Sequence, residues 1–202
     1  MQPEEATVDS WQLRVLGAPG VADMVRRCAC DDTDIPDREG RLGRGFTNLK
    51  RLLGYPDDFA RVVDELADTV PSGQPVAGCD EGSWALAGAV ALRLRVPVLL
   101  IRRTPKTYFV SYGTDPTAAD GRLAGERLPP ATQVHLLDYL VYSGDTLRSA
   151  VEVLRSVGLG ATSASAILWT IRADAAVPAL SSAGLQSVTC LVSQADMAPS
   201  RP

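Results

Sequence analysis

From residue 56 onward, apolar positions alternate between helical spacing and short continuous runs. Segment 56–70 begins with Pro56 and two acidic residues, repeats apolar side chains at helical spacing and ends before Ser72 and Gly73, as a helix does. Further helices are expected at 83–94, 146–157 and 174–183, and strands at 75–79, 96–101, 134–137, 164–170 and 187–192. This alternation predicts an α/β fold with a mostly parallel central sheet flanked by helices.

The first 55 residues give weaker signals. Residues 8–30 carry apolar side chains at loosely helical spacing, interrupted by a turn at 17–20. Residues 31–45 are polar and contain several glycines, and a second long polar stretch covers 102–130. We therefore divide the chain into an amino-terminal segment at 1–55, a core at 56–197 and a tail at 198–202.

Composition narrows the function classes. With 202 residues, of which 46% are apolar and 22% charged, the chain suits one compact domain. Its formal net charge of −4 disfavours a nucleic-acid partner, which requires a clustered basic surface. The start is acidic rather than apolar, and the most apolar stretch, 84–100, is interrupted by two arginines and Pro97. We expect a cytoplasmic protein with no membrane partner.

The cysteines and the histidine argue against a zinc site. Cys28, Cys30, Cys79 and Cys190 lack the paired spacing of zinc ligands, and the single histidine, His135, lies in an apolar run. We expect four reduced thiols in the core or in loops.

Segment 134–146 combines groups that suit a phosphorylated sugar. Its strand ends at Asp138, and a loop with Ser143, Gly144 and Thr146 leads into the next helix. Backbone N–H groups at a helix N-terminus bind phosphate, glycine permits close approach, and an upstream carboxylate suits ribose hydroxyls or a metal ion. The alternative is a plain helix N-cap made by Ser143 or Asp145, without a ligand.

Four segments, taken in order, resemble the type I phosphoribosyltransferase family, and orotate phosphoribosyltransferases in particular. Residues 138–146 are similar to its phosphoribosyl-diphosphate signature, and 76–87 to its pyrophosphate loop. Residues 98–106 resemble its strand and basic loop, and 40–41 with 46–52 its amino-terminal base-side segment. The resemblance implies the type I phosphoribosyltransferase fold, with a hood-like amino-terminal segment, and a homodimer.

The resemblance also implies the chemistry. In this family a nitrogen base displaces diphosphate from C1 of phosphoribosyl diphosphate, and Mg²⁺ shares the charge of the leaving group. The implied partners are therefore small molecules, phosphoribosyl diphosphate and an acceptor base. The implied catalytic residues are Asp138, Arg103 and Lys106, and Asp138 is also the implied metal ligand. The implied substrate-binding residues are Phe46, Lys50, Asp80, Glu81, Gly82, Ser83, Arg102, Tyr139, Tyr142, Ser143, Gly144, Asp145 and Thr146. A solvated basic turn is the alternative for Arg102, Arg103 and Lys106.

Four positions depart from the family pattern. Tyr139 stands where a second acid is usual, and Tyr108 where a loop histidine is usual. Asp145 brings a negative charge into the phosphate loop, which is tolerable if it points outward or meets a cation such as Arg148. Trp84 is bulky where small residues are usual, and we expect it to be a core or dimer-contact aromatic.

We therefore expect a transferase that moves the phosphoribosyl group to a heterocyclic or related small acceptor, in a specialised pathway. The alternative, which Tyr139 and Tyr108 favour, is a non-catalytic regulator that binds phosphoribosyl diphosphate or a nucleotide. An unrelated nucleotide binder such as a methyltransferase is disfavoured, because no Gly-x-Gly-x-x-Gly follows a predicted strand.

Overall fold

The structure is a computed structural model that describes residues 11–28, 35–36, 42–43, 49–80, 82–103, 108–111 and 128–195. The described strands are β1 (Gln12–Val15), β2 (Ile35–Pro36), β3 (Leu42–Gly43), β4 (Val76–Gly78), β5 (Val98–Arg103), β6 (Tyr108–Ser111), β7 (His135–Val141), β8 (Ser163–Trp169) and β9 (Ser187–Ser193). The described α-helices are α1 (Val21–Cys28), α2 (Pro56–Ala67), α3 (Trp84–Leu94), α4 (Asp145–Ser156) and α5 (Val177–Ser182), and the 3-10 helices are η2 (Leu49–Gly54) and η3 (Ile171–Ala176).

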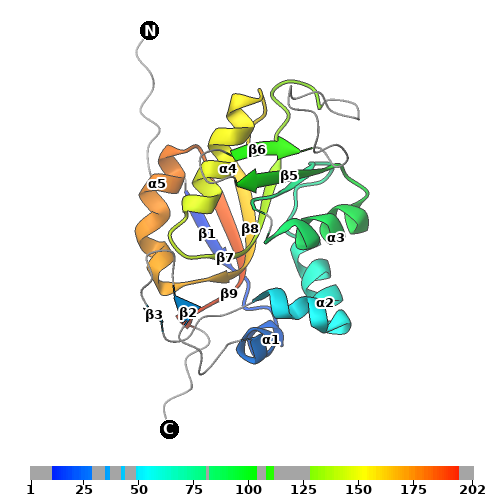
Figure 1. Ribbon diagram of the computed structural model, residues 1–202, viewed down its shortest axis with the longest axis vertical. Helices are drawn as coiled ribbons and strands as arrows, with labels where there is room; N and C mark the ends of the chain where they lie inside the picture. The colour runs from blue at the N-terminus through cyan, green and yellow to red at the C-terminus, as the bar shows by residue number, and fades with distance from the viewer. Residues whose placement is uncertain are drawn as a thin grey trace.

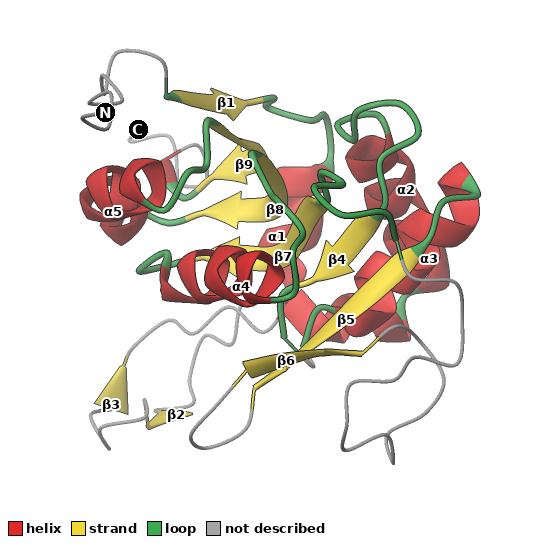
Figure 2. Ribbon diagram, turned by 90° about the horizontal axis from the view of Figure 1, so that it is seen from above, coloured by secondary structure: helices red, strands yellow, loops and turns green. Residues whose placement is uncertain are grey.

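Seven of the described strands form one sheet, in the order β1-β9-β8-β7-β4-β5-β6 (Figure 2). Every neighbouring pair in it is parallel except β5 and β6, which run antiparallel. Strands β2 and β3 form a separate two-stranded ladder. The predicted α/β fold with a mostly parallel sheet is confirmed.

Helices cover both faces of this sheet (Figure 1). On one face α4 and α5 bury apolar residues such as Leu147, Leu154 and Leu180 against the strands. On the other face α1, η2, α2 and α3 contribute a second apolar cluster. The central strands β7 and β8 are buried along almost their whole length, as expected for parallel strands between two helical layers.

The helices predicted at 56–70, 83–94 and 146–157 are confirmed as α2, α3 and α4, with small differences at their ends. α2 begins with a proline in its first turn, followed by two aspartates that favour the positive end of the helix dipole. The helix expected at 174–183 instead starts as η3 and becomes α-helical at Val177, with Pro178 in the first turn of α5.

The helical interpretation of residues 8–30 is wrong in part. Gln12–Val15 is a strand, β1, which pairs in parallel with β9, and only Val21–Cys28 is helical. β1 lies at the sheet edge, and Leu13 is its one half-buried residue. Its alternation of polar and apolar residues is only four residues long, which is too short to distinguish it from loose helical spacing. The domain division at residue 55 stays a prediction, although β1 belongs to the same sheet as the later strands.

Two further expectations need correction. The strand predicted at 134–137 continues to Val141, so Asp138 lies inside β7, where it pairs with Ala166 of β8. A charged residue looked like the strand end, but β8 provides backbone partners beyond it. The polar stretch 102–130 contains the strand β6, which pairs with β5. Of that stretch, 104–107 and 112–127 lie outside the described residues.

Three cysteines, Cys28, Cys79 and Cys190, are free and buried, as expected for core thiols. Cys30 lies outside the described residues. Within the part of the chain that the structure covers, no helix is both long and apolar enough to cross a membrane.

His135 is buried in a chain of hydrogen bonds at the start of β7. Its Nδ1 and Nε2 lie 2.8 Å from Ser163 Oγ and 2.9 Å from Ser165 Oγ, and Ser165 Oγ lies 2.7 Å from Thr69 Oγ1 of the loop after α2. Burial lowers the pKa of His135 to about 4. The imidazole is therefore neutral at pH 7 and links the sheet to the helical layer.

This burial makes stability depend on pH. Between pH 6.5 and about 4 the unfolded chain protonates His135 while the folded protein holds it neutral, so stability falls as the pH drops. We expect a loss of about 3 kcal/mol across this window from His135 alone. Urea unfolding of wild type and His135→Gln at pH 6.5 and 4.5 measures it, because His135 is the only histidine. An equal loss of stability in both proteins would contradict the prediction.

Candidate functional site

The carboxyl ends of β4, β5 and β7 meet at one edge of the sheet. Gly78 of β4 pairs with Leu100 of β5 on one side and Leu137 of β7 on the other. The loop at 79–83, Arg102 and the residues after Asp138 therefore lie at one rim, where parallel α/β sheets bind ligands. We call this edge the rim.

The loop after β7 leaves the N-terminus of α4 without a side-chain cap. Gly144 occupies the N-cap position in the left-handed conformation, with φ of 74°. The Ser143 hydroxyl donates to the Asp145 carboxylate at 2.8 Å and lies a long 3.4 Å from the Asp145 backbone nitrogen. The N-cap residue itself therefore offers no side chain, and Ser143 accepts only one long hydrogen bond, from the Asp145 N–H. The following N–H groups of the first turn of α4 are left available to an anion.

The negative charge of Asp145 meets a cation, as the sequence analysis required. Arg148 Nη2 lies 3.4 Å from Asp145 Oδ1, and Arg148 Nη1 lies 3.0 Å from Glu152 Oε1. These side chains lie along the exposed surface of α4, where the pairs contribute little stability. They nevertheless offset the charge that would otherwise oppose a phosphate.

Gly144 is required for two reasons. Its φ of 74° is strained for any residue with a Cβ. A Cβ there would also lie 2.8 Å from Ala176 Cβ and 3.2 Å from Leu180 Cδ2. The loop at 143–146 therefore packs tightly against η3 and α5.

Asp138 is a carboxyl with an unfavourable environment. It is only 8% exposed, and its Oδ1 accepts a hydrogen bond from the Tyr139 N–H at 2.7 Å. Burial first, and then the negative charge of Asp80, raise the pKa of Asp138 to about 8, although Lys50 opposes this shift. Asp138 thus holds a proton at neutral pH and would ionise readily beside a cation.

The side chain of Tyr139 lies in the helical layer that contains η2, with Leu49 and Leu52 in the same apolar cluster. Its hydroxyl is buried and has no hydrogen-bond partner among the described residues. Burial, helped by the Asp138 carboxyl, raises the pKa of Tyr139 to about 12. A neutral phenol therefore replaces the second acid, and its substrate contact stays a prediction.

Asp80 and Ser83 close a tight turn before α3. The Asp80 N–H donates to Ser83 Oγ at 3.1 Å, and the Ser83 N–H donates to Asp80 Oδ1 at 3.1 Å. At Gly82, between them, a Cβ would lie 2.8 Å from Asp80 Oδ1 and 3.1 Å from Lys50 Nζ. The missing side chain thus makes room for the Lys50 ammonium. Lys50, which belongs to the predicted base-side segment, therefore reaches the rim.

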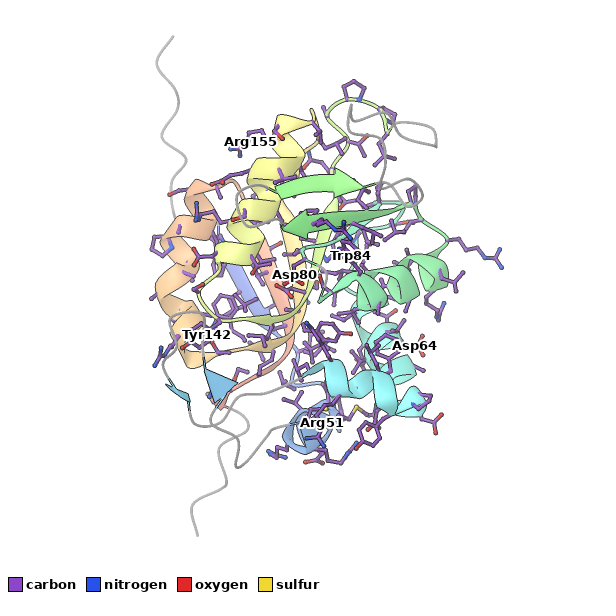
Figure 3. The ribbon with its side chains drawn as sticks, in the orientation of Figure 1. Arg51, Asp64, Asp80, Trp84, Tyr142 and Arg155 are labelled. Atoms are coloured by element: carbon purple, nitrogen blue, oxygen red, sulfur yellow. The ribbon has the colours of Figure 1, made fainter. Side chains whose placement is uncertain are left out.

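Trp84, labelled in Figure 3, begins α3 after this turn and contacts Arg102 of β5. The Trp84 indole N–H donates to the Ile101 carbonyl at 3.0 Å, and Arg102 Cζ lies 5.3 Å from the centre of the indole ring. Trp84 therefore contacts β5 and lies close to Gly78 of β4, and a dimer contact stays a prediction.

Several predicted residues fall outside the description. Arg103 ends β5, but its side chain is outside the described part, as is that of Tyr108 in β6. Phe46, Glu81 and Lys106 lie outside the described residues altogether. Their predicted roles in catalysis and substrate binding stay predictions.

Arg172 is a cation near the rim that the sequence analysis missed. Its Cζ lies 5.3 Å from the ring centre of Tyr142, the exposed residue just before Ser143. Figure 3 labels Tyr142. The contact joins η3 to Tyr142, at the start of the loop that leads into α4. A single arginine after a predicted strand gives no pattern, so only the fold, which brings Arg172 over the Tyr142 ring, reveals this pair.

The chain is similar to curated adenine phosphoribosyltransferases. That of Mycobacteroides abscessus is 31% identical over 163 residues, which cover 75% of this chain and 86% of that protein. That of Mycolicibacterium gilvum is 31% identical over 187 residues, which cover 85% of this chain and 99% of that protein. The chain belongs to the type I phosphoribosyltransferase family. The predicted transferase enzyme is confirmed at the level of this family, whose curated members here carry the adenine rather than the orotate name.

Solved structures of type I phosphoribosyltransferases share the fold. Orotate phosphoribosyltransferase from Aeropyrum pernix superposes with a TM-score of 0.64 at 20% identity, over 88% of this chain and 96% of that chain. Adenine phosphoribosyltransferase from Trypanosoma brucei, in complex with AMP, pyrophosphate and ribose-5-phosphate, gives 0.66 at 16% identity, over 91% and 83%. At these identities the likeness concerns the fold alone. No family model matches the chain.

Replacing Gly144 tests how firmly the loop is held. Gly144→Ala should lose about 1–2 kcal/mol to its positive φ and about 1–3 kcal/mol more to the contact with Ala176. Gly158→Ala is the matched control, because Gly158 has a φ of 81° but no atom within 4 Å of its Cβ position. Urea denaturation of both variants gives the comparison. Equal losses of stability in the two variants would show that packing of η3 and α5 against Gly144 adds no constraint.

Removing the Asp138 carboxyl should stabilise the ligand-free protein. Between pH 3.8 and about 8 the unfolded chain ionises Asp138 while the folded protein keeps it protonated, so this group lowers stability as the pH rises. We expect Asp138→Asn to be more stable than wild type by about 5 kcal/mol at pH 8 and nearly equal to it at pH 4. Thermal unfolding across this range measures the difference, with the exposed Asp64→Asn as control. A gap that is constant with pH would contradict the raised pKa.

Proposed function

We propose that this chain transfers the 5-phosphoribosyl group of phosphoribosyl diphosphate to adenine or a closely related purine, releasing diphosphate. The observation that carries the acceptor is the name shared by its curated relatives, adenine phosphoribosyltransferase, at 31% identity over 86% and 99% of their lengths. A homodimer, a cytoplasmic location and a specialised pathway remain part of the proposal.

The 5-phosphate would bind at the start of α4. Ser143 supplies a hydroxyl, Gly144 allows the backbone to approach, and the Thr146 N–H, in the first turn of α4, lies at the positive end of the helix. Since Arg148 offsets the charge of Asp145, a doubly charged phosphate is not repelled at this position. These contacts would anchor the substrate far from the reacting bond, which orients it without being broken in the reaction.

Asp138 would act on the ribose. The departure of diphosphate leaves positive charge on C1 and the ring oxygen, and an ionised carboxylate nearby stabilises that charge. Asp138 also offers an acceptor for ribose hydroxyls. Since its pKa lies near 8, binding of a cationic or hydroxyl-rich group would shift it towards the ionised form.

The diphosphate would lie over the turn at 80–83. Lys50 reaches this turn from η2, and Arg102 of β5 lies over the ring of Trp84, the residue after the turn. Arg103 and Lys106 would add further positive charge. Cations here stabilise the developing charge of the leaving group.

Mg²⁺ fits this arrangement as a substrate-bound ion. The described residues contain no group of three His, Cys, Asp or Glu side chains that could hold a metal ion. Mg²⁺ commonly binds one or two carboxylates together with substrate phosphates, and Asp138 with its neighbour Asp80 offers such carboxyls. The ion would neutralise the leaving diphosphate.

A non-catalytic regulator is the second candidate, and Tyr139 is the observation that favours it. Its phenol is buried and takes the place of a second acid next to Asp138 in the sequence, so Asp80 is the nearby carboxyl that remains. Such a protein would bind phosphoribosyl diphosphate without turnover.

Diphosphate release distinguishes the candidates. Wild type with Mg²⁺, phosphoribosyl diphosphate and adenine should release diphosphate, and hypoxanthine, guanine, orotate and uracil should support less release. Asp138→Asn should lower the rate about 100-fold or more, because a charge that stabilises the transition state is lost. EDTA should abolish the reaction, and Asp64→Asn, on the exposed surface of α2, should leave it unchanged.

Two outcomes would contradict the proposal in different ways. Release that depends on orotate but not on adenine would assign a different acceptor. Tight binding of phosphoribosyl diphosphate without release on any base would favour the regulator.

A further inference from the structure

Trp84 is wedged between two strands at the start of α3. Gly78 of β4 leaves room for it, since a Cβ at Gly78 would lie 3.2 Å from Trp84 Cδ1. On the other side, the indole N–H donates to the carbonyl of Ile101 in β5 at 3.0 Å. The indole therefore has one orientation, set by contacts with β4 and β5.

The same indole also contacts the side chain of the next residue in β5. Arg102 Cζ lies 5.3 Å from the centre of the Trp84 ring, within the range of a cation–π interaction. A guanidinium is planar and stacks well on an aromatic face. Trp84 thus holds the Ile101 backbone through its N–H and the Arg102 side chain through its ring.

The place where Arg102 is held is the diphosphate side of the rim. Trp84 directly follows the turn at 80–83, in which Asp80 and Ser83 bond to each other. Lys50 reaches the same turn through the space that Gly82 leaves open. Lys50 therefore reaches the turn itself, and Arg102 lies over the ring of the residue that follows the turn.

We propose that Trp84 is a positioning residue that holds Arg102 beside the turn at 80–83, ready to bind the diphosphate of phosphoribosyl diphosphate. The proposal rests on the function proposed above and names a residue that sets affinity for the leaving group. Arginine has many rotamers, and ordering it costs free energy on binding. A side chain already stacked on a fixed indole loses less freedom when the diphosphate arrives.

Binding of Mg²⁺-diphosphate and of phosphoribosyl diphosphate, measured by calorimetry without any base, tests this. Trp84→Leu removes the ring and should weaken both affinities by about 3- to 30-fold, the range of one cation–π interaction. Trp84→Phe keeps a ring face and should restore most of the affinity. Trp11→Phe, in the segment that leads into the edge strand β1, is the control and should bind like wild type.

A double-mutant cycle with Arg102→Met isolates the pair. In the Arg102→Met background, Trp84→Leu should cause little further loss, because the side chain that it positions is gone. Arg102→Lys keeps the charge but not the planar stack, and it should bind more weakly than wild type. This last variant leaves Trp84 intact, so it tests the proposal even if Trp84→Leu does not fold.

The possible outcomes distinguish the positioning role of Trp84 from the function proposed above. A loss from Trp84→Leu that is as large without Arg102 as with it, or an Arg102→Lys variant that binds like wild type, would overturn the positioning role alone. Wild-type protein that binds neither probe would overturn the proposed function and this inference together.

Discussion

Strand β7 lies between β4 and β8, and its parallel pairing with both determines where the candidate site residues lie. The pairing places Gly78 beside Leu137, so the turn at 80–83 and Asp138 reach the rim as neighbours. It also carries β7 past Asp138 to Val141, which delivers the loop at 143–146 to the start of α4. The register matters because side chains alternate between the two faces of a strand. A shift by one residue would exchange Asp138 with Tyr139 and place a carboxyl in the apolar layer under η2.

The same pairing has a cost that function explains. Asp138 is held in a buried position near a second carboxyl, Asp80, and this raises the free energy of its ionised form. A domain selected for stability alone would place a neutral side chain there. Lys50 offsets part of the repulsion from the exposed side, although a diphosphate would compete for the same ammonium. The ligand-free rim is therefore electrostatically frustrated, and this frustration is what a cation and a phosphorylated sugar would relieve. Strain of this kind is typical of sites that bind charged ligands.

Sequence reasoning predicted the sheet and the rim better than it predicted the edges. A strand that is buried on both faces, such as β8, is recognised by its continuous apolar run. An amphipathic helix such as α4 is recognised by its helical period, because burial of one face selects apolar side chains there. β1 was not predicted as a strand, because it is a four-residue edge strand in which only Leu13 is half-buried. Asp138 was placed after the strand rather than within it, since backbone pairing with β8 does not depend on the polarity of the side chain. Arg172 was missed for a related reason, because stacking on Tyr142 joins residues far apart in sequence.

Three glycines show what no periodicity could predict. Gly78, Gly82 and Gly144 each lack a side chain where another element needs the space. The occupants are the Trp84 ring, the Lys50 ammonium and the apolar face of η3 and α5, respectively. The sequence identifies Gly82 and Gly144 as loop residues and Gly78 as a strand residue. It does not show which side chains occupy the space beside them, because only the fold brings those elements together. In this chain two of the three occupants lie beside the turn at 80–83. The positive charge beside that turn therefore comes from residues outside it. Lys50 lies in the space that Gly82 leaves open, and Arg102 lies over the ring of Trp84, which follows the turn.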